Sequence, residues 1–182
     1  NNQSVVYLIQ PNVEVEKNLP EFIQPIYKKF ISSDSNEEFV KLGSQFIFFV
    51  KDTVDLEKLR LSGYNIRQKL DKNITEITLV GNSVQVLALA EGLALSNYQF
   101  LKYFSDADEK EYQLDAINIL GDVSAQQIDE MNQVLKSVFW ARDMVNEPAS
   151  YLTAKQLAKE IQEIGKESNL TVQVLDKKAI QD

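Results

Sequence analysis

Four carboxylates crowd into one short segment of this 182-residue chain, at Asp106, Asp108, Glu109 and Glu111. Clustered carboxylates can bind Ca²⁺, but a calcium loop also needs Gly at its sixth position and Glu at its twelfth. Counted from Asp106, those positions hold Glu111 and Ile117. The pattern therefore favours an acidic loop facing water over a calcium site.

Two expected strand-to-helix junctions contain glycine, and the N-terminus of a helix at such a junction can hold a phosphate. They are residues 81–83 (Gly-Asn-Ser) and 121–124 (Gly-Asp-Val-Ser). Neither has the glycine spacing of a phosphate-binding loop, and Asp122 would repel an anion. Ordinary turns are favoured at both positions.

A third group of charged side chains lies near the end of an expected long helix, at Arg142, Asp143 and Glu147. Arg142 could act as a catalytic cation, yet ion pairing along the helix accounts for the same spacing. No carboxylate pair or metal-ligand cluster has the spacing of a self-sufficient active site. We therefore expect no catalytic, metal-binding or cofactor-binding residue in this chain.

The composition excludes several kinds of site. The chain has no Cys and no His, so it forms no disulfide, no thiolate nucleophile, no Ser-His-Asp triad and no zinc site of the usual kind. Its 19 Lys and Arg against 27 Asp and Glu give a formal net charge of −8, which argues against a nucleic-acid partner. The most apolar stretch, 84–95, is too short to span a membrane, so no membrane partner is expected.

Apolar runs bounded by turn residues predict five strands, at 4–9, 45–50, 76–80, 114–120 and 171–175. Helical spacing predicts helices at 55–70, at 84–104, from Ser124 to Pro148, and from Thr153 onward. Ser124 with Gln127, and Thr153 with Gln156, have the spacing of capping boxes.

The alternation of strands and helices predicts an α/β fold, with a mixed, mostly parallel sheet and helices on both faces. The helix at 84–104 is apolar on nearly all sides and should be buried. Residues 12–44 show no clear pattern, because Pro20 and Pro25 interrupt their helical spacing. The strand at 171–175 would lack a covering helix, which suggests that the chain stops partway through a structural unit.

Three motifs resemble the leucyl aminopeptidases of the M17 family. Residues 141–153 (ARDMVNEPASYLT) are similar to the family signature ARDLVNEPxNxLTP. Residues 90–103 (AEGLALSNYQFLKY) resemble its AEGxxLxxYxFxxY helix, and 172–176 (VQVLD) resemble its VxVLD strand. Departures from the signature lie at Met144, Ser150 and Ala154.

The resemblance implies that this chain is the N-terminal part of a two-domain enzyme. The implied parts are a macro-domain-like α/β domain at 1–123, a linking helix at 124–147 and the start of a catalytic domain at 148–182. The rest of that catalytic domain would carry two divalent metals, Zn or Mn, which activate water against the N-terminal peptide bond of a peptide.

The implied parent is a cytoplasmic homo-hexamer with internally buried active sites. The present chain would pack on its own C-terminal catalytic domain and help to shape assembly and active-site access. By itself we expect it to be inactive as a peptidase.

The family's metal-binding motif has a form close to NTDAEGR, and residues 90–92 reproduce only its AEG. No Asn-Thr-Asp precedes them, and Leu93 stands in place of Arg. Glu91 is therefore not a predicted ligand, and no catalytic or metal residue is carried over from the family. A rival hypothesis is a stand-alone macro-like module that binds a nucleotide or ADP-ribose, although the chain lacks a Gly-rich phosphate loop.

Overall fold

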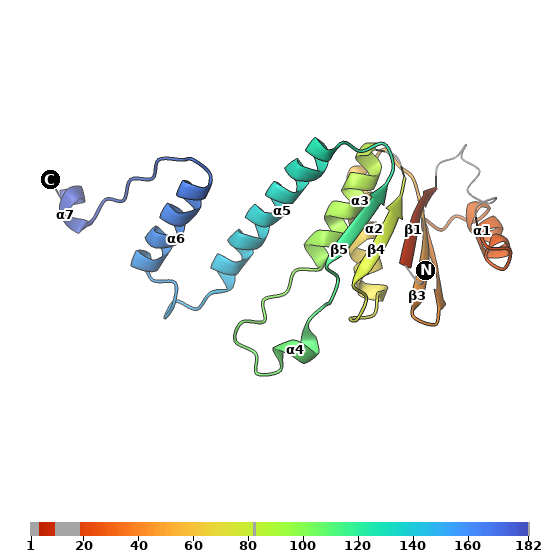
Figure 1. Cartoon of the computed structure of the whole chain (residues 1–182), viewed down its shortest axis with the longest axis horizontal. Coiled ribbons are helices and arrows are strands. Elements are labelled where there is room, and N and C mark those ends of the chain that lie inside the picture. The colour runs from red at the N-terminus through yellow and green to blue at the C-terminus, as the bar shows by residue number, and fades with distance from the viewer. Residues whose placement is uncertain (1–3, 10–18, 82, 182) are drawn as a thin grey trace. The chain divides into compact units, whose positions relative to one another are not determined.

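The computed structural model describes residues 4–9, 19–81 and 83–181 (Figure 1). Two parts of the predictions lie outside the described residues: Asn82, in the first glycine-containing junction, and residues 12–18 of the stretch that showed no clear pattern. The chain divides into two compact units, Asn1–Phe139 and Trp140–Asp182. No helix among the described residues is both long and apolar enough to cross a bilayer.

The larger unit is built on a five-stranded sheet with the strand order β2-β3-β1-β4-β5. The strands are β1 (Ser4–Ile9), β2 (Glu37–Leu42), β3 (Gln45–Lys51), β4 (Glu76–Val80) and β5 (Ala116–Leu120). All neighbouring pairs are parallel except β2 and β3, which are antiparallel. The predicted mixed, mostly parallel sheet is confirmed.

Helices cover both faces of this sheet. α1 (Gln24–Ile31) covers one face, and α2 (Leu56–Lys69) and α3 (Ser83–Ser96) cover the other. Successive side chains on β3 enter the two cores, since Phe48 packs with α2 and α3 whereas Phe49 packs with α1. Burial on both faces explains why β3 is an unbroken apolar run.

The backbones of α2 and α3 are in close contact where the two helices cross. A Cβ on Gly92 would lie 2.0 Å from the carbonyl oxygen of Arg60, and a Cβ on Gly63 would lie 2.3 Å from that of Leu89. The two backbones can approach this closely only because neither glycine carries a side chain. Gly63 lowers the helix propensity of α2, and this contact is the packing reason for its presence.

The helix predicted at 84–104 is wrong in its extent, although its burial is confirmed. Val86, Leu89 and Leu93 are fully buried. The helix ends at Ser96, however, and an irregular stretch leads to the short α4 (Ala107–Lys110). At that end the Asn97 N–H donates to the carbonyl of Ala94 in a tighter turn, and the Asn97 side-chain amide donates to the carbonyl of Leu114 on the returning chain.

Two further differences concern strands. Residues 171–175 form no strand, because no strand in the described part of the chain pairs with them and extended backbone needs such a partner. Conversely, β2 lies in the stretch that showed no clear pattern. It pairs with β3 as a hairpin through Gly43, whose φ of 62° is a left-handed conformation that suits glycine.

The helices α5 (Ala125–Asn146) and α6 (Ala154–Glu167) begin at their predicted caps, and α7 (Lys177–Gln181) follows them. The first capping box is complete, since the Ser124 hydroxyl accepts from the Gln127 N–H (3.2 Å) and the Gln127 side chain accepts from the Ser124 N–H (3.0 Å). The second is half formed. Thr153 accepts from the Gln156 N–H (3.3 Å), but the Gln156 side chain donates to Glu160 instead (2.7 Å).

Gly92→Ala should destabilise the larger unit, because the added methyl group would overlap the carbonyl of Arg60. We expect the free energy of unfolding to fall by about 1–3 kcal/mol, since overpacking outweighs the gain in helix propensity. Urea denaturation followed by circular dichroism measures this change. Gln85→Ala, on the same helix, is the control and should change stability by less than about 0.5 kcal/mol. A Gly92→Ala variant as stable as the original would contradict the close crossing.

Candidate functional site

The acidic segment at 106–111 is a surface element with its own internal pairing. The ammonium group of Lys110 lies 2.9 Å from Asp106 Oδ1 and 4.1 Å from the ring centroid of Phe104. Asp108 and Glu109 are exposed. Across the described residues, no three carboxylates are grouped so that they could hold a metal ion. The segment has the character of a solvated acidic turn.

The glycines at the two strand-to-helix junctions are explained by the packing of neighbouring strand ends. A Cβ on Gly121 would lie 1.9 Å from the carbonyl oxygen of Gly81, and a Cβ on Gly81 would lie 2.8 Å from the side-chain Cβ of Leu8. The Gly81 N–H also donates to the carbonyl of Leu120 (3.1 Å). These contacts leave no room for a side chain at either position, so packing alone accounts for the two glycines.

The AEG tripeptide at 90–92 belongs to the contact between α2 and α3. Ala90 is fully buried, and Gly92 faces the backbone of Arg60. Glu91 Oε2 accepts a hydrogen bond from Arg60 Nε at 2.7 Å, and this bond raises the pKa of the Arg60 guanidinium. Glu91 is therefore engaged with a cation of its own domain.

A groove of about 360 Å³ opens beside this ion pair, between α2, α3 and α5. Its walls are mainly apolar, and Val84 and Val134 remain half exposed in it. Arg60, Glu91 and Glu130 give the groove its charged edge. Its lining contains no Ser, Thr, Lys or Tyr, so the groove offers no nucleophile or general base besides carboxylates.

A buried arginine lies at the other end of α2. Arg67 is only 2% exposed, its Nε donates to Asn97 Oδ1 (2.9 Å), and its guanidinium carbon lies 3.6 Å from the ring centroid of Tyr112. Burial lowers the pKa of Arg67, and the interaction with Tyr112 raises it. The Nη2 atom is buried without a hydrogen-bond partner. Sequence reasoning missed this residue, although its position four after the inward-facing Gly63 was a usable signal.

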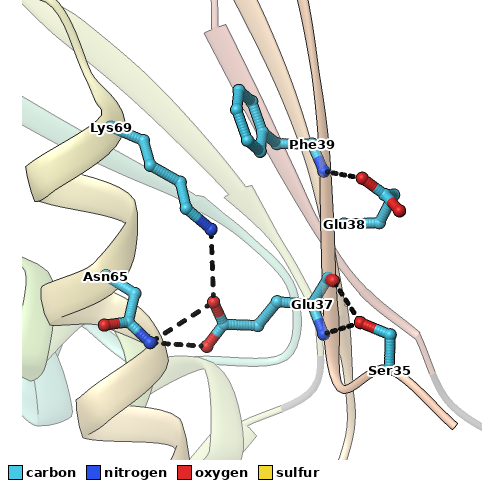
Figure 2. A network of polar contacts seen from close by, with 6 residues as sticks. All are labelled: Ser35, Glu37, Glu38, Phe39, Asn65 and Lys69. Carbon is cyan, nitrogen blue, oxygen red and sulfur yellow. Dashed lines mark hydrogen bonds and ion pairs between the residues drawn. The ribbon is translucent and has the colours of Figure 1, made fainter.

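A second polar cluster ties the edge strand β2 to α2 (Figure 2). Glu37 accepts hydrogen bonds from the Asn65 amide at 3.1 and 3.4 Å, and Lys69 Nζ lies 3.6 Å from the same carboxylate. Lys69 also lies 5.0 Å from the ring centroid of Phe39. These contacts satisfy the charges of an edge strand within its own domain, so the cluster has a structural role.

The signature segment at 141–148 runs from the end of α5 into a turn. The helix ends at Asn146, as expected before Pro148. The Pro148 carbonyl then accepts from the N–H of Tyr151 (2.8 Å). The signature segment contains three charged residues, and each of them interacts with another group: Arg142, Asp143 and Glu147.

The chain resembles curated cytosol aminopeptidases in sequence. It is 28% identical over 133 residues to a probable cytosol aminopeptidase of Sulfurihydrogenibium sp. (strain YO3AOP1), matching 67% of this chain and 26% of that protein. It is 33% identical over 114 residues to one from Clostridium perfringens, matching 58% and 23%. The chain thus spans about a quarter of the length of these relatives. No protein-family model matches the chain.

Solved leucine aminopeptidases share its fold. A mutant tomato leucine aminopeptidase matches with a TM-score of 0.73 at 15% identity, over 99% of this chain and 43% of that one. The Caenorhabditis elegans leucine aminopeptidase matches with a TM-score of 0.61 at 14% identity, over 92% and 38%. This chain is a leucine-aminopeptidase-like domain. The resemblance to leucyl aminopeptidases inferred from the sequence motifs is confirmed. The share of each relative that the chain covers is consistent with the N-terminal part of a longer enzyme.

We predict that the leucine-aminopeptidase-like domain binds neither Zn²⁺ nor Mn²⁺ with sub-micromolar affinity. Four-coordinate zinc normally recruits Cys or His, which the chain lacks, and its described carboxylates do not converge. Isothermal titration calorimetry of the 182-residue chain measures this affinity. Glu91→Gln should leave the heats unchanged, because Glu91 already binds Arg60. Stoichiometric sub-micromolar binding that Glu91→Gln abolishes would show that Glu91 is a metal ligand after all.

Proposed function

We propose that this chain is the non-catalytic N-terminal domain of a leucyl-aminopeptidase-like metallopeptidase that removes N-terminal amino acids from peptides. The observation that carries the proposal is the coverage, because 67% of this chain matches only 26% of a cytosol aminopeptidase. Most of such an enzyme lies outside the matched region. In this proposal hydrolysis takes place there, and peptide substrates meet the catalytic domain.

The two divalent metals, Zn or Mn, belong to the catalytic domain in this proposal. The residues described for this chain do not fit such a pair, since no three of their carboxylates could hold one metal ion together. The domain therefore contributes structure rather than chemistry. The relatives' name, cytosol aminopeptidase, supports a cytoplasmic location.

Exposed apolar residues in the smaller unit support a role in assembly. On α6, Leu157 and Ile161 are 38% and 39% exposed, and Val145 at the end of α5 is 84% exposed. Apolar side chains that share one helix face normally pack against a partner surface. A catalytic domain, or a neighbouring subunit of a hexamer, would provide that surface, and the domain would then help to shape access to an enclosed active site.

A chimeric enzyme tests the proposal. This chain would replace the corresponding N-terminal residues of the Clostridium perfringens relative, and hydrolysis of leucine p-nitroanilide would be measured with Mn²⁺ present. We expect the chimera to be active and oligomeric by analytical ultracentrifugation. We expect the 182-residue chain alone to be inactive, because no three carboxylates among its described residues could hold a metal ion together.

Ile161→Glu in the chimera should lower the yield of assembled, active enzyme at least about tenfold, because it would bury an unpaired charge in the proposed interface. Lys159→Glu, on the same helix and outside the apolar face, is the matched control and should change the yield less than about twofold. Equal yields from the two variants would show that α6 does not pack on the catalytic domain.

A further inference from the structure

Polar side chains hold the connection between α3 and β5 closed. The Gln99 side chain donates to the carbonyl of Lys110 (3.0 Å) and accepts from the N–H of Tyr112 (2.7 Å). The Asn97 side chain donates to the carbonyl of Leu114 (3.0 Å). Two amides therefore bridge the outgoing and returning halves of the connection, which gives it the closed ends of an Ω-loop.

Apolar burial contributes little to this connection. Every residue from 98 to 113 is at least partly exposed, and Tyr103 and Phe104 each expose about half of their surface, 55% and 51%. The next buried residue is Leu114. Tyr98 packs against Phe139 of α5, with 5.4 Å between the ring centroids. From Gln99 to Gln113, the bridging amides and Arg67 beneath them are main contributors to the conformation.

Arg67 lies beneath this connection and contacts both of its halves. Its Nε donates to Asn97 on the outgoing half, its guanidinium lies against the ring of Tyr112 on the returning half, and its Nη1 donates to the carbonyl of Leu70 (3.3 Å). None of the described carboxylates forms an ion pair with it, and its Nη2 is buried without a partner. A desolvated cation without a counter-charge is costly, and opening the connection would return it to water.

We propose that residues 98–113 form a strap that opens as a local unit, with Arg67 as its latch. On the Arg67 side, the closed state depends on one hydrogen bond to Asn97 and one ring contact with Tyr112, while hydration of the guanidinium favours the open state. The sheet and the core between α2 and α3 are the same in the closed and the open state. The strap therefore opens without unfolding of the domain, and this inference does not depend on the proposed enzymatic role.

Arg67→Met tests the latch, because methionine replaces the unbranched aliphatic stem of arginine but has no charge and no hydrogen-bond donors. Hydrogen exchange in the full chain, followed by NMR, would report on the Gln113 N–H, which donates to the carbonyl of Lys72 (2.8 Å) in the closed state. We expect this amide to exchange at least about tenfold faster in Arg67→Met. Amides of α3 should change less than about twofold, because the core between α2 and α3 lies outside the strap.

Two further variants complete the test. Gln99→Ala removes the hydrogen bonds to Lys110 and Tyr112 and should accelerate exchange of the same Gln113 amide. Arg60→Met, on α2 but away from the strap, should leave that exchange rate unchanged. The proposal is overturned if the Gln113 amide exchanges no faster in Arg67→Met, or if it accelerates by the same factor as α3. Should Arg67→Met fail to fold, the same two outcomes in Gln99→Ala overturn it.

Discussion

The rest of the larger unit depends on the crossing of α2 and α3, where Gly63 and Gly92 let two backbones meet without side chains between them. This crossing places both helices against one sheet face and closes the core around Leu89 and Leu93. It also sets Arg60 beside Glu91. In this unit, the AEG tripeptide and the Arg60–Glu91 ion pair resemble parts of a functional site, but both follow from the packing of the two helices.

The sequence predicted those parts of the fold in which local pattern and tertiary environment agree. Parallel strands buried on both faces are continuous apolar runs, so β1, β3 and β4 were found within a residue or two of their ends. β2 was missed because its charged Glu37 is paired with Asn65 and Lys69 of α2, which are distant in sequence. Residues 171–175 have strand propensity, but propensity without a neighbouring strand forms no sheet.

The candidate sites show the same division. Motif spacing set Glu91 apart from a metal-binding motif, and in the structure that carboxylate is paired with Arg60. Arg67 was missed because an arginine within a helix ordinarily faces water. Its burial arises from the returning chain at Tyr112 and from Asn97, both at least thirty residues away, and no local pattern encodes such a contact.

The central proposal is that the larger unit is stable by itself, whereas Trp140–Asp182 packs on a catalytic domain. Hydrogen exchange in the monomeric chain tests it most directly, by comparing the amides of α3 with those of α6. The account predicts that α6 amides exchange at least about a hundredfold faster, because no apolar side chain of α6 is fully buried. Equal protection of the two helices would show that 1–182 unfolds as one cooperative domain.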